Sequence, residues 1–210
     1  MRLWRTCLTV AATACALVGG AGCFHDTLEP EELAWNPYRG GETLVFTSDR
    51  GGRDTMLVRA VIRGIYPGGV GTPLLAPEEL MVAGTFTDPN HDRSLDGVLL
   101  EIRARTLREP AEINFRFAAE NARFHADPYR LDSVAALPVT RLRTGAGVLD
   151  DVRVVVTNTF RYADRSNAVR SISWSRRYGY VAFEKMDGER WTLEQMYRVP
   201  VEPYNSRVGP

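Results

Sequence analysis

The segment from Asp88 to Gly97 carries the chain's closest approach to a metal-binding pattern. Oxygen-bearing side chains stand at every second position: Asp88, Asn90, Asp92, Ser94 and Asp96. Calcium takes several oxygen ligands, and one short loop can wrap the ion when ligands alternate in this way. However, Arg93 stands where such a loop needs its turn glycine, and Leu99 where it needs a bidentate glutamate. The spacing leaves two hypotheses, a calcium loop and a solvated turn capped by Asp and Asn side chains.

A second candidate site lies in the C-terminal third, where aromatic residues and arginines are neighbours. Trp174, Arg176, Arg177 and Tyr178 lie together in the stretch SWSRRYG. Exposed aromatic rings beside arginines can stack on sugars or anchor a partner protein. The competing hypothesis is that Trp174, together with Phe183 and Trp191 further along, belongs to the core of a C-terminal hairpin.

Residue patterns for catalysis are sparse. The chain has three histidines, and none is spaced with another His, Cys or Glu as a zinc-ligand pair. The sequence has no Gly-x-Ser-x-Gly elbow, no P-loop and no Gly-x-Gly-x-x-Gly turn. Neighbouring carboxylates such as Asp150 and Asp151 point to opposite faces of a strand, so their spacing does not make an acid–base pair. We therefore expect a protein that is not an enzyme and needs no cofactor.

The charge balance argues against nucleic acid as a partner. The chain has 26 basic and 26 acidic residues, and the first 22 residues contain only Arg2 and Arg5 as charged groups. Without them, 24 basic residues remain against 26 acidic ones. A domain this close to neutral has no basic excess with which to neutralise phosphates.

The N-terminus has the three-part order of a secretory signal peptide. Two arginines are followed by an apolar run from Cys7 to Val18, and then by the small residues 19–22. The apolar run falls short of the roughly 20 residues that a membrane-spanning helix needs. This order predicts a cleaved signal peptide over residues 1–22 and an exported protein.

The four residues Gly20-Ala21-Gly22-Cys23 resemble the lipobox of bacterial lipoproteins, although Gly20 stands where a leucine is usual. This resemblance implies cleavage before an acylated Cys23, which would anchor the chain to a membrane; ordinary cleavage at an Ala-x-Ala-like site is the alternative. Cys7 and Cys15 lie in the segment to be removed, so the mature chain keeps no pair of cysteines for a disulfide. In a double-membraned bacterium, Phe24 after the cysteine resembles the signal for the outer membrane.

The patterns in the rest of the chain predict strands joined by tight turns. Gly51-Gly52 and Asp187-Gly188 each stand between β-rich runs and predict hairpins. The run around Leu100, Ile102 and Ala104 alternates apolar and polar residues, as does EINFRF (residues 112–117), in which Asn114 falls on the polar face. This period of two is typical of half-buried strands with one wet face. The stretch 118–137 is compatible with either a short helix or a loop.

These patterns predict a mainly β protein, an antiparallel β-sandwich or open barrel built from hairpins, with little helix. We divide the chain into a signal peptide (1–22), a lipidated N-terminus and tether (23–38), a β-rich domain (39–198) and an irregular tail (199–210).

The early stretch YRGGETLVFTSDRGGRDTMLV and the late stretch SWSRRYGYVAFEKMDGERWTL resemble two hairpin motifs of uncharacterised bacterial envelope lipoproteins. The motifs consist of core aromatics and turn glycines, so the resemblance implies a fold rather than a chemistry. We expect a non-catalytic lipoprotein of the cell envelope that has a structural role or binds another envelope protein. The alternative is a carrier of an apolar ligand held in a cavity of the β-sheet.

Overall fold

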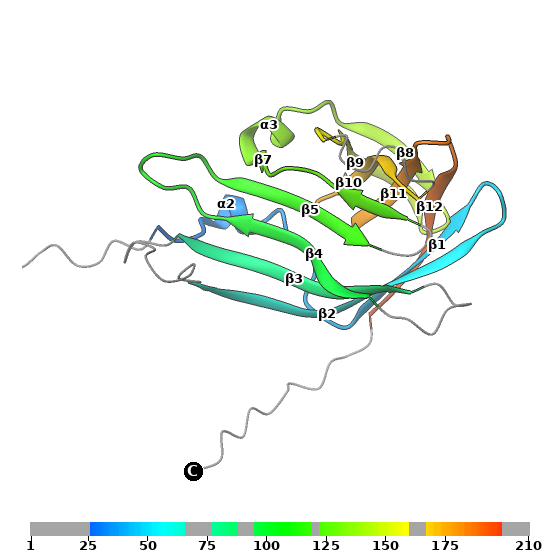
Figure 1. The fold of residues 1–210 in the computed structure, drawn as a ribbon, viewed down its shortest axis with the longest axis horizontal. Coiled ribbons are helices and arrows are strands. Elements are labelled where there is room, and N and C mark those ends of the chain that lie inside the picture. Colours follow the sequence, from blue (N-terminus) through cyan, green and yellow to red (C-terminus); the bar gives the residue numbers. More distant parts are fainter. Residues whose placement is uncertain (1–25, 66–76, 88–94, 119–121, 160–166, 199–210) are drawn as a thin grey trace, which may run out of the picture.

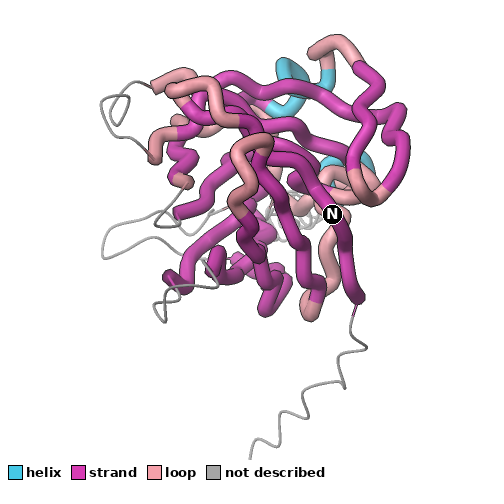
Figure 2. Tube along the Cα trace, turned by 90° about the vertical axis from the view of Figure 1, so that its right-hand side faces the viewer, coloured by secondary structure: helices cyan, strands magenta, loops and turns pink. Residues whose placement is uncertain are grey.

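In a computed structural model of the chain, the structure describes residues 26–65, 77–87, 95–118, 122–159 and 167–198. Strands make up most of this trace, and its helices are short (Figure 2). None of the helices in these ranges is long and apolar enough to cross a membrane. The expectation of a mainly β, antiparallel fold with little helix is confirmed.

The described ranges contain two helices and twelve strands. The helices are α2 (Pro30–Leu33) and α3 (Leu131–Ala135). The strands are β1 (Glu42–Ser48), β2 (Arg53–Ile65), β3 (Glu78–Thr87), β4 (Leu95–Arg103), β5 (Glu112–Ala118), β6 (Arg123–His125), β7 (Tyr129–Arg130), β8 (Thr140–Thr144), β9 (Gly147–Val156), β10 (Val169–Ser175), β11 (Gly179–Lys185) and β12 (Arg190–Arg198).

All the strands belong to one sheet, in which most neighbours along the chain pair with each other, as in a meander. The order across the sheet is β6-β5-β4-β3-β2-β1-β12-β11-β10-β9-β8, with β7 paired to β5 (Figure 1). The last strand therefore lies beside the first, and every pairing between named strands is antiparallel. The sheet is not closed, because β6 and β8 form its two edges.

Hydrogen bonds from side chains and loops bridge the open seam between the β6–β7 segment and the end of β9. The Tyr129 hydroxyl donates to the Val156 carbonyl at 2.7 Å. Asp127 and Asn158 form two hydrogen bonds with each other. The Asp127 N–H donates to Asn158 Oδ1 at 2.9 Å, and Asn158 Nδ2 donates to the Asp127 carbonyl oxygen at 3.2 Å. These contacts satisfy backbone groups that a continuous ladder would otherwise pair.

Aromatic side chains from both halves of the sheet fill the space between them. Trp174 on β10 is fully buried, with its ring centroid 5.0 Å from that of Phe115 on β5 and 5.0 Å from that of Tyr180 on β11. The Tyr180 hydroxyl donates to the Leu99 carbonyl on β4 at 2.6 Å. The curled sheet therefore packs against itself around one aromatic core.

Residues 26–38 differ from the expected tether, because they pack onto the domain. Leu28, Trp35 and Tyr38 are each no more than 4% exposed. The Leu28 N–H donates to the Glu78 carboxylate at 2.9 Å, which ties this segment to the start of β3. Burial of three large apolar side chains, each contributing roughly 1.5–3 kcal/mol, outweighs the freedom that a spacer would keep.

Both predicted hairpins and both predicted half-buried strands are present, and these two strands, β4 and β5, pair with each other. Positive-φ glycines, Gly51 and Gly188, form the turns between β1 and β2 and between β11 and β12. On β4 and β5 the alternating apolar residues face the core as expected. Asn114 lies on the opposite face but is only 3% exposed, so it is not on the wet surface that the alternation predicted.

Candidate functional site

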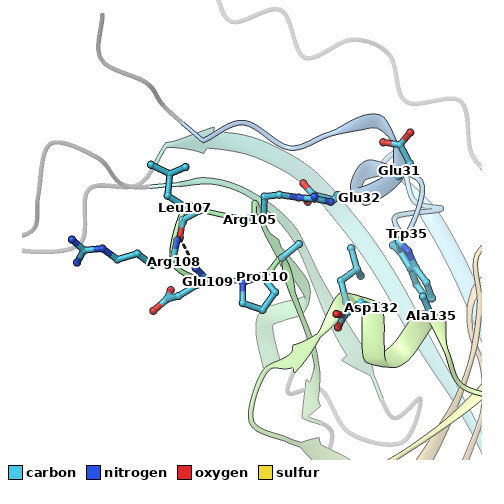
Figure 3. A pocket seen from close by; sticks show the side chains of 13 residues that line it. Glu31, Glu32, Trp35, Arg105, Leu107, Arg108, Glu109, Pro110, Asp132 and Ala135 are labelled. Carbon is cyan, nitrogen blue, oxygen red and sulfur yellow. Dashed lines mark hydrogen bonds and ion pairs between the residues drawn. The ribbon is translucent and has the colours of Figure 1, made fainter. Parts of the chain in front are cut away.

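An open cleft of about 520 Å³ lies between three segments that are far apart in sequence: α2, the turn between β4 and β5, and α3 (Figure 3). Its walls combine apolar and charged side chains. The lining residues are Glu31, Glu32, Trp35, Arg105, Thr106, Leu107, Arg108, Glu109, Pro110, Ala111, Leu131, Asp132 and Ala135. A concave site with an apolar base and charged groups around it is typical of ligand and partner binding.

The first wall is positioned by the start of α2. Pro30 stands in its first turn, where its missing N–H and restricted φ favour a helix start. Glu32 reaches back and accepts from the Glu29 N–H at 3.0 Å, as in a capping box. The other oxygen of this buried carboxylate accepts from Arg105 Nε at 3.1 Å, although the Arg105 side chain itself is two-thirds exposed (67%). This ion pair joins α2 to the β4–β5 turn.

Trp35 forms the buried base of the cleft and is held by two arginines. The guanidinium of Arg153 on β9 lies 5.4 Å from the Trp35 ring centroid, and that of Arg176 lies 5.2 Å from it. Arg176 also donates from Nε to the Ala34 carbonyl at 3.2 Å. Cation–π contacts of this kind fix the ring, so the base of the cleft is preorganised.

The β4–β5 turn forms the second wall and is held by its own hydrogen bonds. Thr106 Oγ1 accepts from the N–H groups of Arg108 at 3.1 Å and Glu109 at 2.9 Å. At its tip, the Leu107 side chain is fully exposed. An ordered turn therefore presents a large apolar side chain to solvent beside the cleft.

The third wall is α3, which is tied to the same turn. The Leu131 N–H donates to the Ala111 carbonyl at 2.8 Å. Asp132 accepts from Arg130 at 2.6 Å, and this hydrogen bond from the guanidinium lowers the pKa of the carboxyl group. The Asp132 carboxylate on the rim of the cleft therefore stays charged at neutral pH.

Carboxylate, guanidinium and apolar side chains line the cleft in the part of the chain that the structure describes. Its lining residues include no serine, cysteine or histidine. Across the described ranges, no group of three or more His, Cys, Asp or Glu side chains is placed to hold a metal ion.

The candidate calcium loop is only partly within the described residues. Asp88, Asn90, Asp92 and Ser94 lie outside them, and Asp96 lies on β4 at a position whose side chain is also outside the description. Cys23, the proposed lipidation site, lies outside as well.

The four residues predicted as a binding group have separate environments. Trp174 is a core residue with no exposed surface, so its ring cannot contact a partner, which corrects that part of the hypothesis. Tyr178 is partly buried against the same core, whereas Arg176 and Arg177 are exposed. The competing hypothesis of core aromatics holds for Trp174, Phe183 and Trp191. Trp35, which the sequence interpretation had not selected, is the aromatic partner of Arg176.

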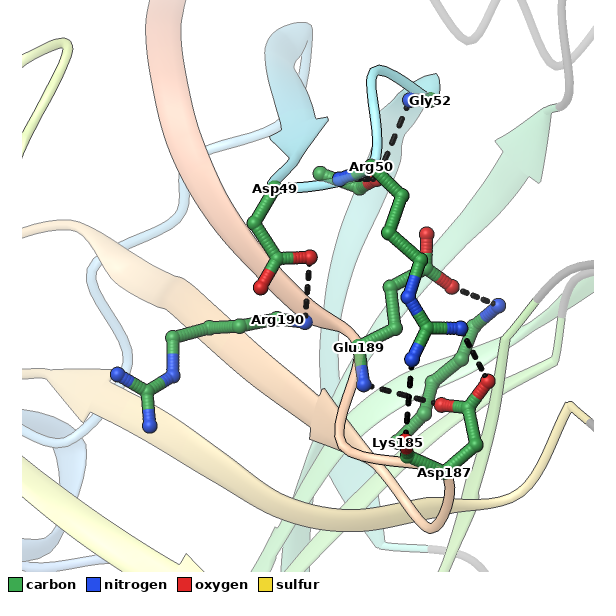
Figure 4. Close-up of polar contacts among 8 residues, drawn as sticks. Asp49, Arg50, Gly52, Lys185, Asp187, Glu189 and Arg190 are labelled. Atoms are coloured by element: carbon green, nitrogen blue, oxygen red, sulfur yellow. Dashed lines mark hydrogen bonds and ion pairs between the residues drawn. The ribbon is translucent and has the colours of Figure 1, made fainter.

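The two hairpin motifs selected from the sequence lie side by side and share polar contacts (Figure 4). Lys185 Nζ lies 2.6 Å from Glu189 Oε2, and both side chains are close to nine-tenths buried. Burial raises the pKa of Glu189, but hydrogen bonds from Lys185 and Ser48 outweigh it, so the pKa is lowered overall. The carboxylate and ammonium are thus mutually neutralised. This ion pair spans the turn between β11 and β12.

No protein-family model, curated protein or solved structure matched this chain. An inference about its function therefore rests on the sequence and on the geometry described above.

Proposed function

We propose that this chain is a non-catalytic lipoprotein of the bacterial cell envelope, anchored through acyl groups on Cys23, whose β-domain binds another envelope protein. The anchor rests on the order of positive, apolar and small residues before Cys23. Each buried acyl methylene adds about 0.8 kcal/mol of membrane affinity, so two or three chains hold the protein firmly. We propose the outer membrane as the destination, because Phe24 after the cysteine resembles the signal for that membrane.

The observation that carries the binding role is the cleft, with Trp35 at its base and Leu107 exposed at its mouth. Protein interfaces concentrate their binding energy in a few aromatic, arginine and apolar residues that become desolvated together. Four acidic residues line the cleft against two arginines; Glu32 and Asp132 are already paired with Arg105 and Arg130, which leaves Glu31 and Glu109 to attract basic side chains. The partner segment that fits best is therefore extended, with an apolar side chain flanked by basic ones.

Protein binding is favoured over carriage of an apolar ligand because of how the interior is packed. Trp174, Tyr180 and Phe115 occupy the space between the halves of the sheet. The described cleft lies outside this core and has charged walls. Charged walls suit a peptide better than an acyl chain, because an apolar ligand would remove the charged groups from water without offering them hydrogen bonds.

Site-specific photo-crosslinking in cells tests the binding role. A photoreactive residue is placed at Leu107 in the cleft or, as a matched control, at the exposed Arg143 on β8. A discrete adduct from position 107 alone, identified by mass spectrometry as an envelope protein, is the expected result. Adducts of equal yield from both positions, or none from position 107, would contradict the proposal.

Mass spectrometry of the mature N-terminus tests the anchor separately. The expected N-terminal peptide begins with acylated Cys23, and a Cys23→Ala variant should leave the membrane fraction. An unacylated N-terminus at another residue would refute lipidation while leaving the binding role of the cleft open.

A further inference from the structure

The described part of the chain starts at the end of the sheet where β2 ends and β3 begins. The Glu78 N–H donates to the Asp26 carbonyl at 2.8 Å, and the Glu78 carboxylate accepts from the Leu28 N–H at 2.9 Å. Arg63 donates to the same carboxylate at 2.6 and 2.9 Å. Because Leu28 is also buried in the core, Asp26 is held at a fixed point on the domain.

The cleft lies at the same end of the sheet. The Ala104 N–H donates to the Glu78 carbonyl at 2.9 Å, so two backbone hydrogen bonds in series connect Asp26 to Ala104. Segments paired in this way lie about 4.8 Å apart, which separates these two backbones by about 10 Å. The next residue, Arg105, already lines the cleft. Figure 1 shows the β4–β5 turn at the same end of the domain as the start of the described chain, and the β1–β2 turn at the opposite end.

The distance along the chain from Asp26 to the proposed lipid anchor is short. Cys23 precedes Asp26 by three positions. Whatever its conformation, a chain covers at most about 3.6 Å per residue, so the two residues lie within about 11 Å of each other. With the acyl groups of Cys23 in a bilayer, the cleft wall at Ala104 lies within about 20 Å of the membrane surface. The opposite end of the domain is much farther from the anchor, since β2 alone has 13 residues and is about 40 Å long.

We infer that the cleft works at the membrane surface and binds the stretch of an envelope protein that directly adjoins a membrane-spanning segment. This role rests on the proposed acylation of Cys23 and on the proposed binding function of the cleft. A folded domain of 100 residues has a radius of gyration of about 13 Å and is therefore roughly 34 Å across. A segment that enters a cleft within about 20 Å of the bilayer must come from the membrane-facing edge of its protein. About six extended residues span that distance, so a stretch that leaves the bilayer reaches the cleft directly.

The charges of the cleft favour a protein segment over the lipid headgroups themselves. Four carboxylates line it against two guanidinium groups, and Glu31 and Glu109 are both exposed. Anionic headgroups are repelled by this excess of carboxylates, whereas basic side chains are attracted to the cleft and to the headgroups alike. The fully exposed Leu107 offers an apolar contact beside these acids. A membrane-adjacent stretch with an apolar side chain between basic ones therefore fits both the cleft and its location.

Peptide mapping of the photo-crosslinked adduct from position 107 tests the class of partner. The cross-linked peptide should lie within about ten residues of a membrane-spanning segment, because that length of extended chain exceeds the distance from the bilayer to the cleft. A peptide remote from such a segment, or a partner that has none, would overturn this inference and leave the binding function of the cleft standing. The absence of any protein adduct, or an adduct with phospholipid alone, would overturn both.

Energy transfer to acceptor-labelled lipid headgroups tests the orientation without a partner. The acylated protein is placed in vesicles of phosphatidylethanolamine and phosphatidylglycerol, with a donor fluorophore on Arg108→Cys or, as the matched control, Arg50→Cys. Both positions are exposed arginines in turns, at opposite ends of the domain. Transfer from position 108 should be at least twofold more efficient than transfer from position 50. Equal transfer, or stronger transfer from position 50, would overturn the inference.

A spacer connects this result to the lipid anchor. Insertion of about 40 Gly and Ser residues between His25 and Asp26 adds a flexible segment with a mean span of about 35 Å. Transfer from position 108 should then fall to the level seen from position 50. As a control, an insertion of two residues of the same composition should leave most of the difference in place. Transfer from position 108 that is unchanged by the long spacer would show that the anchor does not position the cleft, and would overturn the inference.

Discussion

Arg50, in the turn between β1 and β2, donates two hydrogen bonds to Asp187, in the turn between β11 and β12, although 137 positions separate them. Nη1 lies 2.7 Å from Oδ2 of the carboxylate, and Nη2 lies 3.0 Å from the Asp187 carbonyl oxygen (Figure 4). The backbones are joined as well, because the Asp49 N–H donates to the Arg190 carbonyl at 3.0 Å. The turns of the first and last hairpins therefore lie together at one end of the four central strands of the sheet.

Asp187 should make stability depend on pH in the acidic range. The Glu189 N–H, followed by Arg50, lowers the pKa of this carboxyl group. Its contribution is present above the ordinary pKa of about 4 and is lost as pH falls through the lower folded-state pKa. Asp187→Asn keeps an acceptor for the Glu189 N–H but removes the charge. The variant should lose less stability than the parent between pH 5 and pH 3 in urea denaturation. Equal losses would contradict this assignment, and the overall effect should be small because the pair is exposed.

Lys185→Met should destabilise the protein by about 2–4 kcal/mol, because it leaves the Glu189 carboxylate buried without its partner. Lys185→Met combined with Glu189→Gln should recover most of that loss, since no charge is then buried. Chemical denaturation of the two single variants and the double variant at pH 7 gives the coupling. Additive losses would show that the two groups do not stabilise each other.

Gly179→Ala should destabilise the domain by roughly 2–4 kcal/mol, combining a left-handed backbone with overpacking. Gly179 has a φ of +81°, and a Cβ there would collide with the ring and hydroxyl of Tyr38. Gly51→Ala is the matched control, because its φ is +87° and nothing lies within 4 Å of the added carbon. It should cost only about 1–2 kcal/mol. Equal losses in urea denaturation would mean that the Tyr38 contact is unimportant.

Trp35→Ala should cost about 3–5 kcal/mol, as expected for a large aromatic residue removed from a packed site. The same substitution in a flexible tether would not change the free energy of unfolding, so this variant tests whether residues 26–38 belong to the domain. Glu31→Ala, four residues earlier and exposed, should change stability by less than about 0.5 kcal/mol. Thermal unfolding followed by tryptophan fluorescence and circular dichroism provides the measurement.

The strands were the most predictable part of the fold, because a period of two depends only on nearby residues. The alternation of apolar and polar residues correctly placed one set on the core face: Leu100, Ile102 and Ala104. The two Gly-containing turns were equally predictable, since positive φ favours glycine. The burial of Asn114 was harder to predict, because Pro128 and the charged side chains that surround it belong partly to other segments.

The cleft could not be predicted from the sequence. Its walls come from residues 31–35, 105–111 and 131–135, and no pattern within any of these segments indicates the other two. Trp35 gave no signal because it lies in an irregular stretch, where neither a strand nor a helix period marks buried positions. An Arg-rich neighbourhood was recognised at residues 176–177, but its aromatic partner is Trp35 rather than Trp174.

By itself the sequence determined the strand class, the hairpins and the order of positive, apolar and small residues that predicts export, because each depends on residues close together in the chain. Only the tertiary structure decided that β12 lies beside β1, that the N-terminal segment packs onto the domain and that Asn114 and Trp35 line hollows. Those outcomes depend on contacts between residues up to about 140 positions apart, whose burial and hydrogen bonding are known only once the sheet has curled.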